Sequence, residues 1–179
     1  MKNTNHSLFD KYEMIKDLGT GSSGSVTLVR HISMDQERAL KKVPKASAFA
    51  ESALSEARLL KSLEHPSIPR IFDFEDDDAF YYIVEEYIDG ETLDSFLLHQ
   101  QLISPGLFFN ICEQLCNVFI YLHTQISTPI IYRDLKPEHI IVCHNKLKLI
   151  DFGVSAYVIQ DGNNFNHYGN IEFSAPECF

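Results

Sequence analysis

Residues 130–153 read IIYRDLKPEHIIVCHNKLKLIDFG, and this stretch is the most informative part of the sequence about the fold. It holds two short, mainly apolar runs, II at 130–131 and LKLI at 147–150. An aspartate follows each run within three residues. Loops at the ends of strands often present functional side chains, so we expect Asp134 and Asp151 to point to one place. Lys136 follows two residues after Asp134. Two carboxylates beside a lysine indicate a site for a polyanion held through a metal ion.

The segment YRDLKPEH resembles the catalytic loop of protein kinases, and the triplet DFG at 151–153 resembles the metal-binding triplet that follows this loop in the family. RDLKPE, together with FSAPE at 173–177, is typical of the Ser/Thr class. The resemblance implies that Asp134 orients a substrate hydroxyl and accepts its proton, that Lys136 neutralises transferred charge, and that Asp151 holds magnesium. The implied cofactor is ATP, and the implied partner is a protein substrate with serine or threonine.

The stretch LGTGSSGSV at 18–26 fits the glycine-rich loop of the same family, in which the backbone closes over phosphates. A GxGxxG pattern also occurs in ordinary turns and in dinucleotide-binding folds. A dinucleotide-binding fingerprint opens a helix, whereas the residues after this loop alternate as a strand does, which counts against that fold. By resemblance, the residues of this stretch that contact the nucleotide are Leu18, Gly19, Gly21, Gly24 and Val26.

The segment RALKKV alternates as a strand, which puts Lys41 on the same face as Ala39 and Val43. That face is apolar, and an unpaired buried charge costs several kcal/mol. The helix expected next has an apolar stripe, formed by Phe49, Ala53, Leu60 and Leu63. Glu56 is the only charged residue on this stripe, so we expect it to pair with Lys41. The pair resembles the lysine and glutamate of active kinases, whose lysine binds the nucleotide phosphates. The alternative is an ordinary surface lysine and an exposed helix glutamate.

The segment EEYIDG at 85–90 resembles the kinase hinge, which offers backbone groups to adenine at Glu86 and Ile88. By resemblance, Val26 and Ala39 lie on one side of the base and Ile141 on the other. Glu85 stands where the family usually has an apolar or small polar residue. The acidic run EDDD just before the preceding strand lacks calcium-loop spacing, and we interpret it as a solvated hairpin tip.

Two residues depart from the family pattern. His139 stands where the catalytic loop has an asparagine that holds a second magnesium, and imidazole suits zinc or manganese better than magnesium. His139 is therefore a candidate metal ligand beside Asp151, or a residue that fills space and hydrogen-bonds the loop. Asn170 replaces the threonine usual in Ser/Thr kinases. These departures keep open a catalytically impaired module that binds ATP and acts through a partner. A small-molecule kinase of the aminoglycoside-kinase fold fits the glycine-rich loop and the APE segment less well.

The length of 179 residues suits an α+β, protein-kinase-like fold of two lobes. We expect residues 1–88 to form a small antiparallel sheet with one helix, and residues 89–179 to form a partial, mainly helical lobe. In the second lobe, a long helix starting at Pro105 carries a stripe predicted to be buried, formed by Phe108, Ile111, Leu115, Val118 and Leu122. Kinase domains continue with several helices beyond the APE segment, whereas this sequence stops at Phe179, so we expect a truncated product, a fragment or an incomplete sequence.

Composition and charge restrict the partners and the cellular compartment expected for the protein. A formal charge of −10 argues against non-specific binding to nucleic acid or to an anionic membrane surface. The four cysteines form no CxxC pair and no zinc-binding spacing, so we interpret them as reduced thiols. The sequence has no apolar run of membrane-spanning length and no signal peptide pattern, and together with the cysteines this predicts a cytoplasmic protein.

Overall fold

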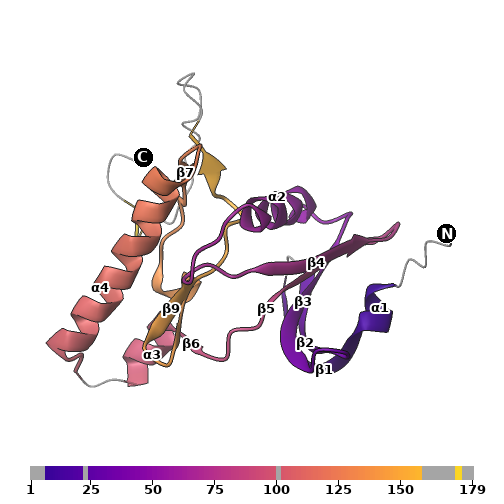
Figure 1. Cartoon of the computed structure of the whole chain (residues 1–179), viewed down its shortest axis with the longest axis horizontal. Helices are drawn as coiled ribbons and strands as arrows, with labels where there is room; N and C mark the ends of the chain where they lie inside the picture. Colours follow the sequence, from indigo (N-terminus) through magenta and orange to yellow (C-terminus); the bar gives the residue numbers. More distant parts are fainter. Residues whose placement is uncertain (1–6, 22–23, 100–101, 159–171, 175–179) are drawn as a thin grey trace. The chain divides into compact units, whose positions relative to one another are not determined.

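The computed structural model describes residues 7–21, 24–99, 102–158 and 172–174. The chain forms two compact units, one of residues 1–62 with 70–87 and the other of residues 63–69 with 88–179. Figure 1 shows the elements of both units along the chain. Asn170 and most of the APE segment, which the sequence singled out, lie outside the described residues.

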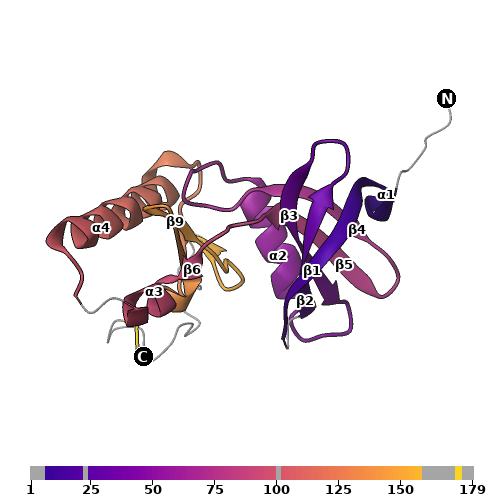
Figure 2. The ribbon, with the colours of Figure 1, turned by 90° about the horizontal axis from the view of Figure 1, so that it is seen from below.

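The first unit is a five-stranded antiparallel sheet with two helices. The strand order is β1-β2-β3-β5-β4. The strands are β1 (Tyr12–Gly21), β2 (Gly24–His31), β3 (Gln36–Pro44), β4 (Ile71–Asp76) and β5 (Phe80–Glu86). The helices are α1 (Leu8–Lys11) and α2 (Ala50–Lys61), and Figure 2 shows α2 beside the sheet strands β3 and β5, which it contacts. The predicted small sheet with one main helix is confirmed.

Each face of this sheet carries its own apolar core. On one face, α1 contributes Leu8 to a buried cluster with Tyr12, Val29, Leu40, Tyr82 and Val84. On the other face, α2 contributes Ala53 and Ala57, which pack with Val43 and Ile83. Full burial of a Val, Leu or Ile side chain contributes about 1.5–3 kcal/mol, so these alternating residues supply the main reason that the strands keep their register.

The acidic run at the β4–β5 turn is a hairpin tip, as interpreted from the sequence. The Asp77 carboxylate accepts hydrogen bonds from the N–H groups of Ala79, at 2.8 Å, and Phe80, at 2.7 Å. It also accepts one from the Tyr82 hydroxyl at 2.8 Å. These bonds, led by that of Ala79, hold the pKa of Asp77 below its ordinary value. Asp77 therefore closes the turn by capping its backbone donors.

The second unit combines helices with two small sheets. Its helices are α3 (Leu93–His99) and α4 (Pro105–Ile120), followed by the π-helical turn η1 (Tyr121–Gln125) and later the short 3-10 helix η2 (Pro137–His139). The strands β6 (Glu91–Thr92), β8 (Ile140–Cys143) and β9 (Lys146–Leu149) form one antiparallel sheet. β7 (Ile130–Ile131) pairs with β10 (Ala156–Tyr157). Among the described residues, no helix is long and apolar enough to cross a membrane.

Helix α4 begins as predicted but buries less of itself than predicted. The Ser104 hydroxyl accepts a hydrogen bond from the N–H of Leu107 at 3.2 Å, and Pro105 occupies the first turn. Of the predicted buried stripe, Val118 and Leu122 are fully buried, whereas Phe108 is 53% exposed. The reason is length, because α4 runs for about 24 Å and the four residues of β9, which it contacts, for about 13 Å.

Three of the four cysteines lie among the described residues. Cys112, Cys116 and Cys143 are free thiols, and Cys178 lies outside the described residues. Cys112 and Cys116 lie one turn apart on α4, where a helix cannot close a disulfide between them without distortion of its backbone. No disulfide constrains the described part of either unit.

Candidate active site

In the first unit, Lys41 and Glu56 form the ion pair that the sequence predicted. The Lys41 ammonium on β3 lies 2.8 Å from the Glu56 carboxylate on α2. Glu56 is only 7% exposed, so its charge is nearly removed from water and depends on this partner. The register places Val26 opposite Lys41, two residue pairs from Ala39, so all three side chains belong to the same face of the sheet. Lys41, predicted to contact phosphate, therefore shares one face with Val26 and Ala39, which are predicted to contact the base.

The glycine-rich loop joins β1 to β2, with Gly21 paired to Gly24 and residues 22–23 outside the described part. Gly24 has a φ of +134°, and a Cβ added there would lie 2.2 Å from the carbonyl oxygen of Lys42. Only glycine fits this position. At Gly19 and Gly21, by contrast, an added Cβ would meet no atom within 4 Å. These two glycines leave the space beside the backbone open, as a loop that receives a ligand requires.

Two of the predicted hinge residues make backbone hydrogen bonds within their own units. The N–H of Glu86 donates to the carbonyl of Arg70 at 2.9 Å, so this N–H is not a donor for a base. In the second unit, the carbonyl of Ile88 accepts from the N–H of Gly90 at 3.1 Å. A Cβ added to Gly90 would lie 2.8 Å from the side chain of Ile141 on β8, so glycine allows this close approach.

In the second unit, Tyr132 joins the two loops that carry the aspartates. Its side chain is buried, and its hydroxyl donates to the carbonyl of Ile150, the residue before Asp151. The backbone carbonyl of Tyr132 in turn accepts from the Ser155 hydroxyl at 3.0 Å. The Tyr132 ring also packs edge-on against Phe152, with 5.0 Å between ring centroids. These contacts hold the segment before Asp134 and the DFG triplet in one fixed arrangement.

Two residues of these loops have left-handed backbone conformations. Arg133 has a φ of +73° and Asp151 a φ of +60°. Such values are uncommon for residues other than glycine, and they cluster at functional sites, where surrounding contacts hold them. Arg133 stands directly before Asp134, so both aspartates are presented from turns that the local hydrogen bonds maintain.

Four of the side chains predicted to be catalytic or metal-binding, those of Asp134, Lys136, His139 and Asp151, lie close together in the second unit. The Lys136 ammonium lies 3.4 Å from the Oδ2 of Asp134. His139 lies between the two aspartates, with Nδ1 3.4 Å from the Oδ2 of Asp134 and Nε2 3.3 Å from the Oδ2 of Asp151. The sequence predicted either a metal ligand or a histidine that hydrogen-bonds the loop, and Nδ1 makes such a loop contact, 3.0 Å from the backbone carbonyl oxygen of Asp134. His139 is 8% exposed, whereas the side chain of Asp151 is 54% exposed and open to a ligand.

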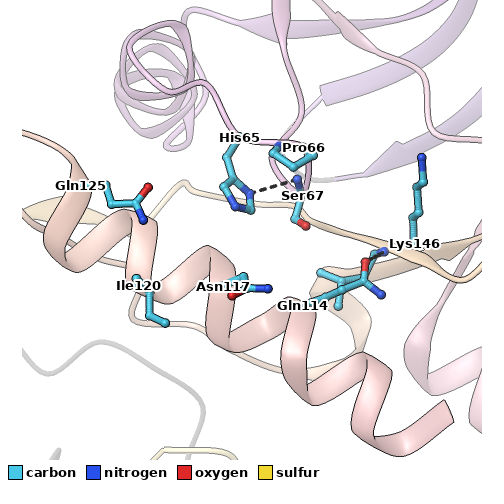
Figure 3. A pocket seen from close by; sticks show the side chains of 9 residues that line it. His65, Pro66, Ser67, Gln114, Asn117, Ile120, Gln125 and Lys146 are labelled. Carbon is cyan, nitrogen blue, oxygen red and sulfur yellow. Dashed lines mark hydrogen bonds between the residues drawn. The ribbon is translucent and has the colours of Figure 1, made fainter. Parts of the chain in front are cut away.

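Two cavities lined by described residues of the second unit differ in whether a predicted site residue lines them. A cavity of about 250 Å³ is lined by Asp134, Tyr132 and aromatic side chains that include Phe119 and Phe173. A cavity of about 460 Å³ lies elsewhere, between α4, η1, β9 and the loop at 63–69, and none of the predicted site residues lines it (Figure 3).

Its wall includes His65, whose Nδ1 accepts from the N–H of Ser67 at 3.1 Å. Figure 3 shows this bond at the edge of the cavity. Burial, with a smaller repulsion from Lys148, lowers the pKa of His65 below its ordinary value. The volume of this cavity does not make it the candidate active site, because no aspartate or glutamate is among the described residues that line it.

Comparison with known proteins finds similarity to protein kinases. Residues 12–179 match the family model described as protein kinase domain. The chain is 30% identical to the serine/threonine-protein kinase PrkC of Bacillus subtilis, over 93% of the chain and 26% of that relative. It is 34% identical to the serine/threonine-protein kinase ppk25 of Schizosaccharomyces pombe, over 90% of the chain and 39% of that relative. It is 32% identical to calcium-dependent protein kinase 4 of Plasmodium falciparum, over 99% of the chain and 35% of that relative. The chain thus spans about a quarter to two fifths of their lengths.

Proposed function

Because this chain belongs to the protein kinase family, we propose that the protein transfers the γ-phosphoryl group of ATP to serine or threonine hydroxyls of a protein substrate. The observation that carries this proposal is the grouping of Asp134, Lys136 and Asp151 around His139 in one unit. The sequence RDLKPE supports the Ser/Thr class, as do the names of the relatives PrkC and ppk25.

The residues present fit the ATP and divalent metal that this family uses. Gly19 and Gly21 leave open space beside their backbone, and Lys41 offers an ammonium that Glu56 keeps in place. Asp151 offers an exposed carboxylate. We assign phosphate contacts to Lys41 and the glycine-rich loop, base contacts to Leu18, Val26, Ala39, Glu86, Ile88 and Ile141, and metal contacts to Asp151 and His139. The metal, magnesium or manganese, supplies charge neutralisation on phosphate oxygens.

The chain's own residues then have distinct roles in the transfer. The carboxylate of Asp134 orients the substrate hydroxyl and accepts its proton. Lys136 neutralises charge on the transferred group, and its contact with this same carboxylate supports that role. The bonds from Tyr132 to Ile150 and from Ser155 to Tyr132 keep Asp134 and Asp151 in register. Precise placement of this kind is a large part of catalysis in phosphoryl transfer.

Transfer of radiolabelled phosphate from ATP to generic protein substrates tests the proposal. The variant Asp134→Asn removes the proton acceptor but keeps the shape of the side chain, so we expect the rate to fall by about a hundredfold or more. Nucleotide binding, measured by calorimetry, is expected to persist in this variant. Phosphate transfer by Asp134→Asn at the wild-type rate would overturn the assignment.

A second candidate is a catalytically impaired module that binds ATP and regulates a partner. The observation that favours it is His139, which replaces the family's asparagine and links both aspartates. This candidate predicts that the wild-type protein binds ATP with a divalent metal and transfers no phosphate. The same two measurements, of binding and of transfer, therefore separate the two functions.

We further propose that the protein works in the cytoplasm on protein partners. The free thiols of Cys112, Cys116 and Cys143 support a reducing compartment. The formal charge of −10 does not favour nucleic acid as a partner. Immunofluorescence of the tagged protein in its own cell would test the location.

A further inference from the structure

Several polar side chains line the larger cavity of the second unit and make no hydrogen bond within the described part of the chain. The clearest is Ser67, which is 6% exposed and whose hydroxyl has no partner among the described residues. A buried hydroxyl without a hydrogen bond costs about 1–3 kcal/mol, so we expect a molecule in the cavity to supply one. The side-chain amides of Asn117 on α4 and Gln125 on η1 likewise have no described partner.

His65 adds a hydrogen-bond donor to this cavity. Its Nδ1 accepts from the N–H of Ser67 at 3.1 Å, so the proton of the neutral ring is on Nε2. Nε2 carries a proton in the charged ring as well, and its role as a donor therefore does not depend on the charge of His65. Figure 3 shows the side chains of His65 and Ser67 pointing from the loop at 63–69 toward α4. The loop thus supplies two donors to one side of the cavity.

The charge around the cavity is positive. Among the described residues that line it, Lys146 alone has a permanent charge, and none is an aspartate or a glutamate. A second cation, Lys148, lies near enough to His65 to contribute to the lowering of its pKa. Gln114, another residue of the wall, is already bonded to the backbone of Asn145 and Leu147. Donors and cations without a carboxylate favour an anion as the occupant.

Contacts around the cavity hold its wall in place. The Tyr121 hydroxyl on η1 accepts from the N–H of Glu64 at 2.8 Å, and its ring lies beside that of His65, with 5.1 Å between centroids. The π-helical form of η1 is itself informative, because π-helical turns are rare and frequently occur at functional sites. The cavity volume of about 460 Å³ lies within the usual range for small-molecule sites, about 300–1,000 Å³.

We propose that this cavity binds a small organic anion, whose carboxylate or phosphate group accepts hydrogen bonds from the Ser67 hydroxyl and from Nε2 of His65. The amides of Asn117 and Gln125 serve the polar groups on the rest of the ligand, and the apolar side chains of the wall contact its carbon atoms. None of the residues assigned to ATP lines this cavity, so the site does not depend on the proposed kinase function.

Calorimetry of the whole chain with two probes, citrate and glycerol phosphate, tests the site at millimolar concentrations. We expect at least one probe to bind with one-to-one stoichiometry, and its identity distinguishes a carboxylate from a phosphate ligand. Ser67→Ala removes the hydroxyl and keeps both backbone hydrogen bonds of the residue, so binding should weaken about tenfold. Asn117→Phe fills the cavity from an exposed position on α4 and should abolish binding.

The matched control is Ser95→Ala on α3, which removes a hydroxyl that does not line the cavity and should leave binding unchanged. Thermal unfolding shows whether each variant is folded. Failure of both probes to bind the wild-type protein overturns the proposal, as does equal binding by wild type and folded Ser67→Ala. Binding that is lost in Lys41→Ala and kept in Ser67→Ala would assign the anion to the predicted phosphate contact of the first unit, which also overturns it.

Discussion

The ammonium nitrogen of Lys41 lies 2.8 Å from the Oε2 of Glu56, and this pair joins strand β3 to helix α2. The side chain of Glu56 is 9% exposed and that of Lys41 is 22% exposed. The pair is thus mostly removed from water, and each charge depends on the other for compensation. It also holds the Lys41 ammonium in place for the phosphate contact assigned to it. We therefore expect stability and nucleotide binding in this unit to be coupled through this contact.

Removing the carboxylate should weaken both properties. In Glu56→Ala the Lys41 ammonium loses its contact with the Glu56 carboxylate in a mostly buried position, so we expect the free energy of unfolding to fall by about 2 kcal/mol. Denaturant unfolding measures this change, and calorimetry should show weaker ATP binding. Glu51→Ala, an exposed position in the first turn of the same helix, is the control, with an expected change below about 1 kcal/mol. Equal effects of both variants would mean that the pair contributes nothing specific.

The glycine-rich loop should tolerate alanine at one position and reject it at another. Gly24→Ala brings a Cβ to within 2.2 Å of the Lys42 carbonyl oxygen, at a φ of +134° that other residues rarely adopt. We expect the free energy of unfolding to fall by about 3 kcal/mol. Gly21→Ala meets open space, so the fold should keep its stability. Thermal unfolding of both variants checks this difference, and matching melting temperatures would contradict it.

His65 should make the protein less stable in mild acid. Its pKa in the folded protein is lowered, first by burial and then by Lys148, so the folded state binds the proton less tightly than the unfolded state does. The contribution of His65 is therefore complete above the ordinary histidine pKa of 6.5 and is lost as the pH falls below this value. Denaturant unfolding at neutral pH and at about pH 5 should show this decline.

The variant His65→Asn isolates that effect. Its side-chain oxygen can accept the N–H of Ser67, as asparagine does in Asx turns, but the residue does not titrate. We expect a shallower loss of stability between neutral pH and mild acid. The exposed His144→Asn serves as the control and should keep the wild-type slope. A slope that is unaltered in His65→Asn would show that other groups govern the acid response.

Phosphorylation of Ser155 should not activate the protein. The Ser155 hydroxyl donates to the carbonyl of Tyr132, and a phosphate there would remove this donor and add negative charge near Asp151. Between Asp151 and Glu177 the chain has no threonine, and its other serine is Ser174. Mass spectrometry of the active protein should therefore find no stoichiometric phosphoserine in this segment. A phosphoserine whose level rises with activity would count against this prediction.

The variant Ser155→Ala tests the contact itself. Loss of one hydrogen bond should lower the free energy of unfolding by about 1 kcal/mol and slow phosphate transfer, because the DFG triplet is held less firmly. Denaturant unfolding and the transfer assay measure the two effects. Ser95→Ala, on α3, is a control that alters a hydroxyl away from the DFG triplet.

The sequence alone determined the parts of this protein that depend on local periodicity. Alternation along 38–43 placed Lys41 on an inner face, and the helical spacing of the next segment placed Glu56 on the stripe facing it. The structure confirms their contact. Such patterns are readable because the side-chain periods of strands and helices are constant, and only one face of each element is buried. The motifs around Asp134 and Asp151 could be recognised for a different reason, because each motif occupies a short continuous segment of the sequence.

Tertiary structure decided the features that join distant segments. The position of His139 between Asp134 and Asp151 depends on how η2 and the β8–β9 hairpin turn back, which no local period encodes. The helical spacing of apolar residues predicted that Phe108 is buried, and this prediction was wrong. Phe108 is exposed because the strand that α4 contacts is shorter than the helix. The sequence thus identifies the candidate residues for the chemistry, whereas the distances between them arise only when separate segments pack against one another.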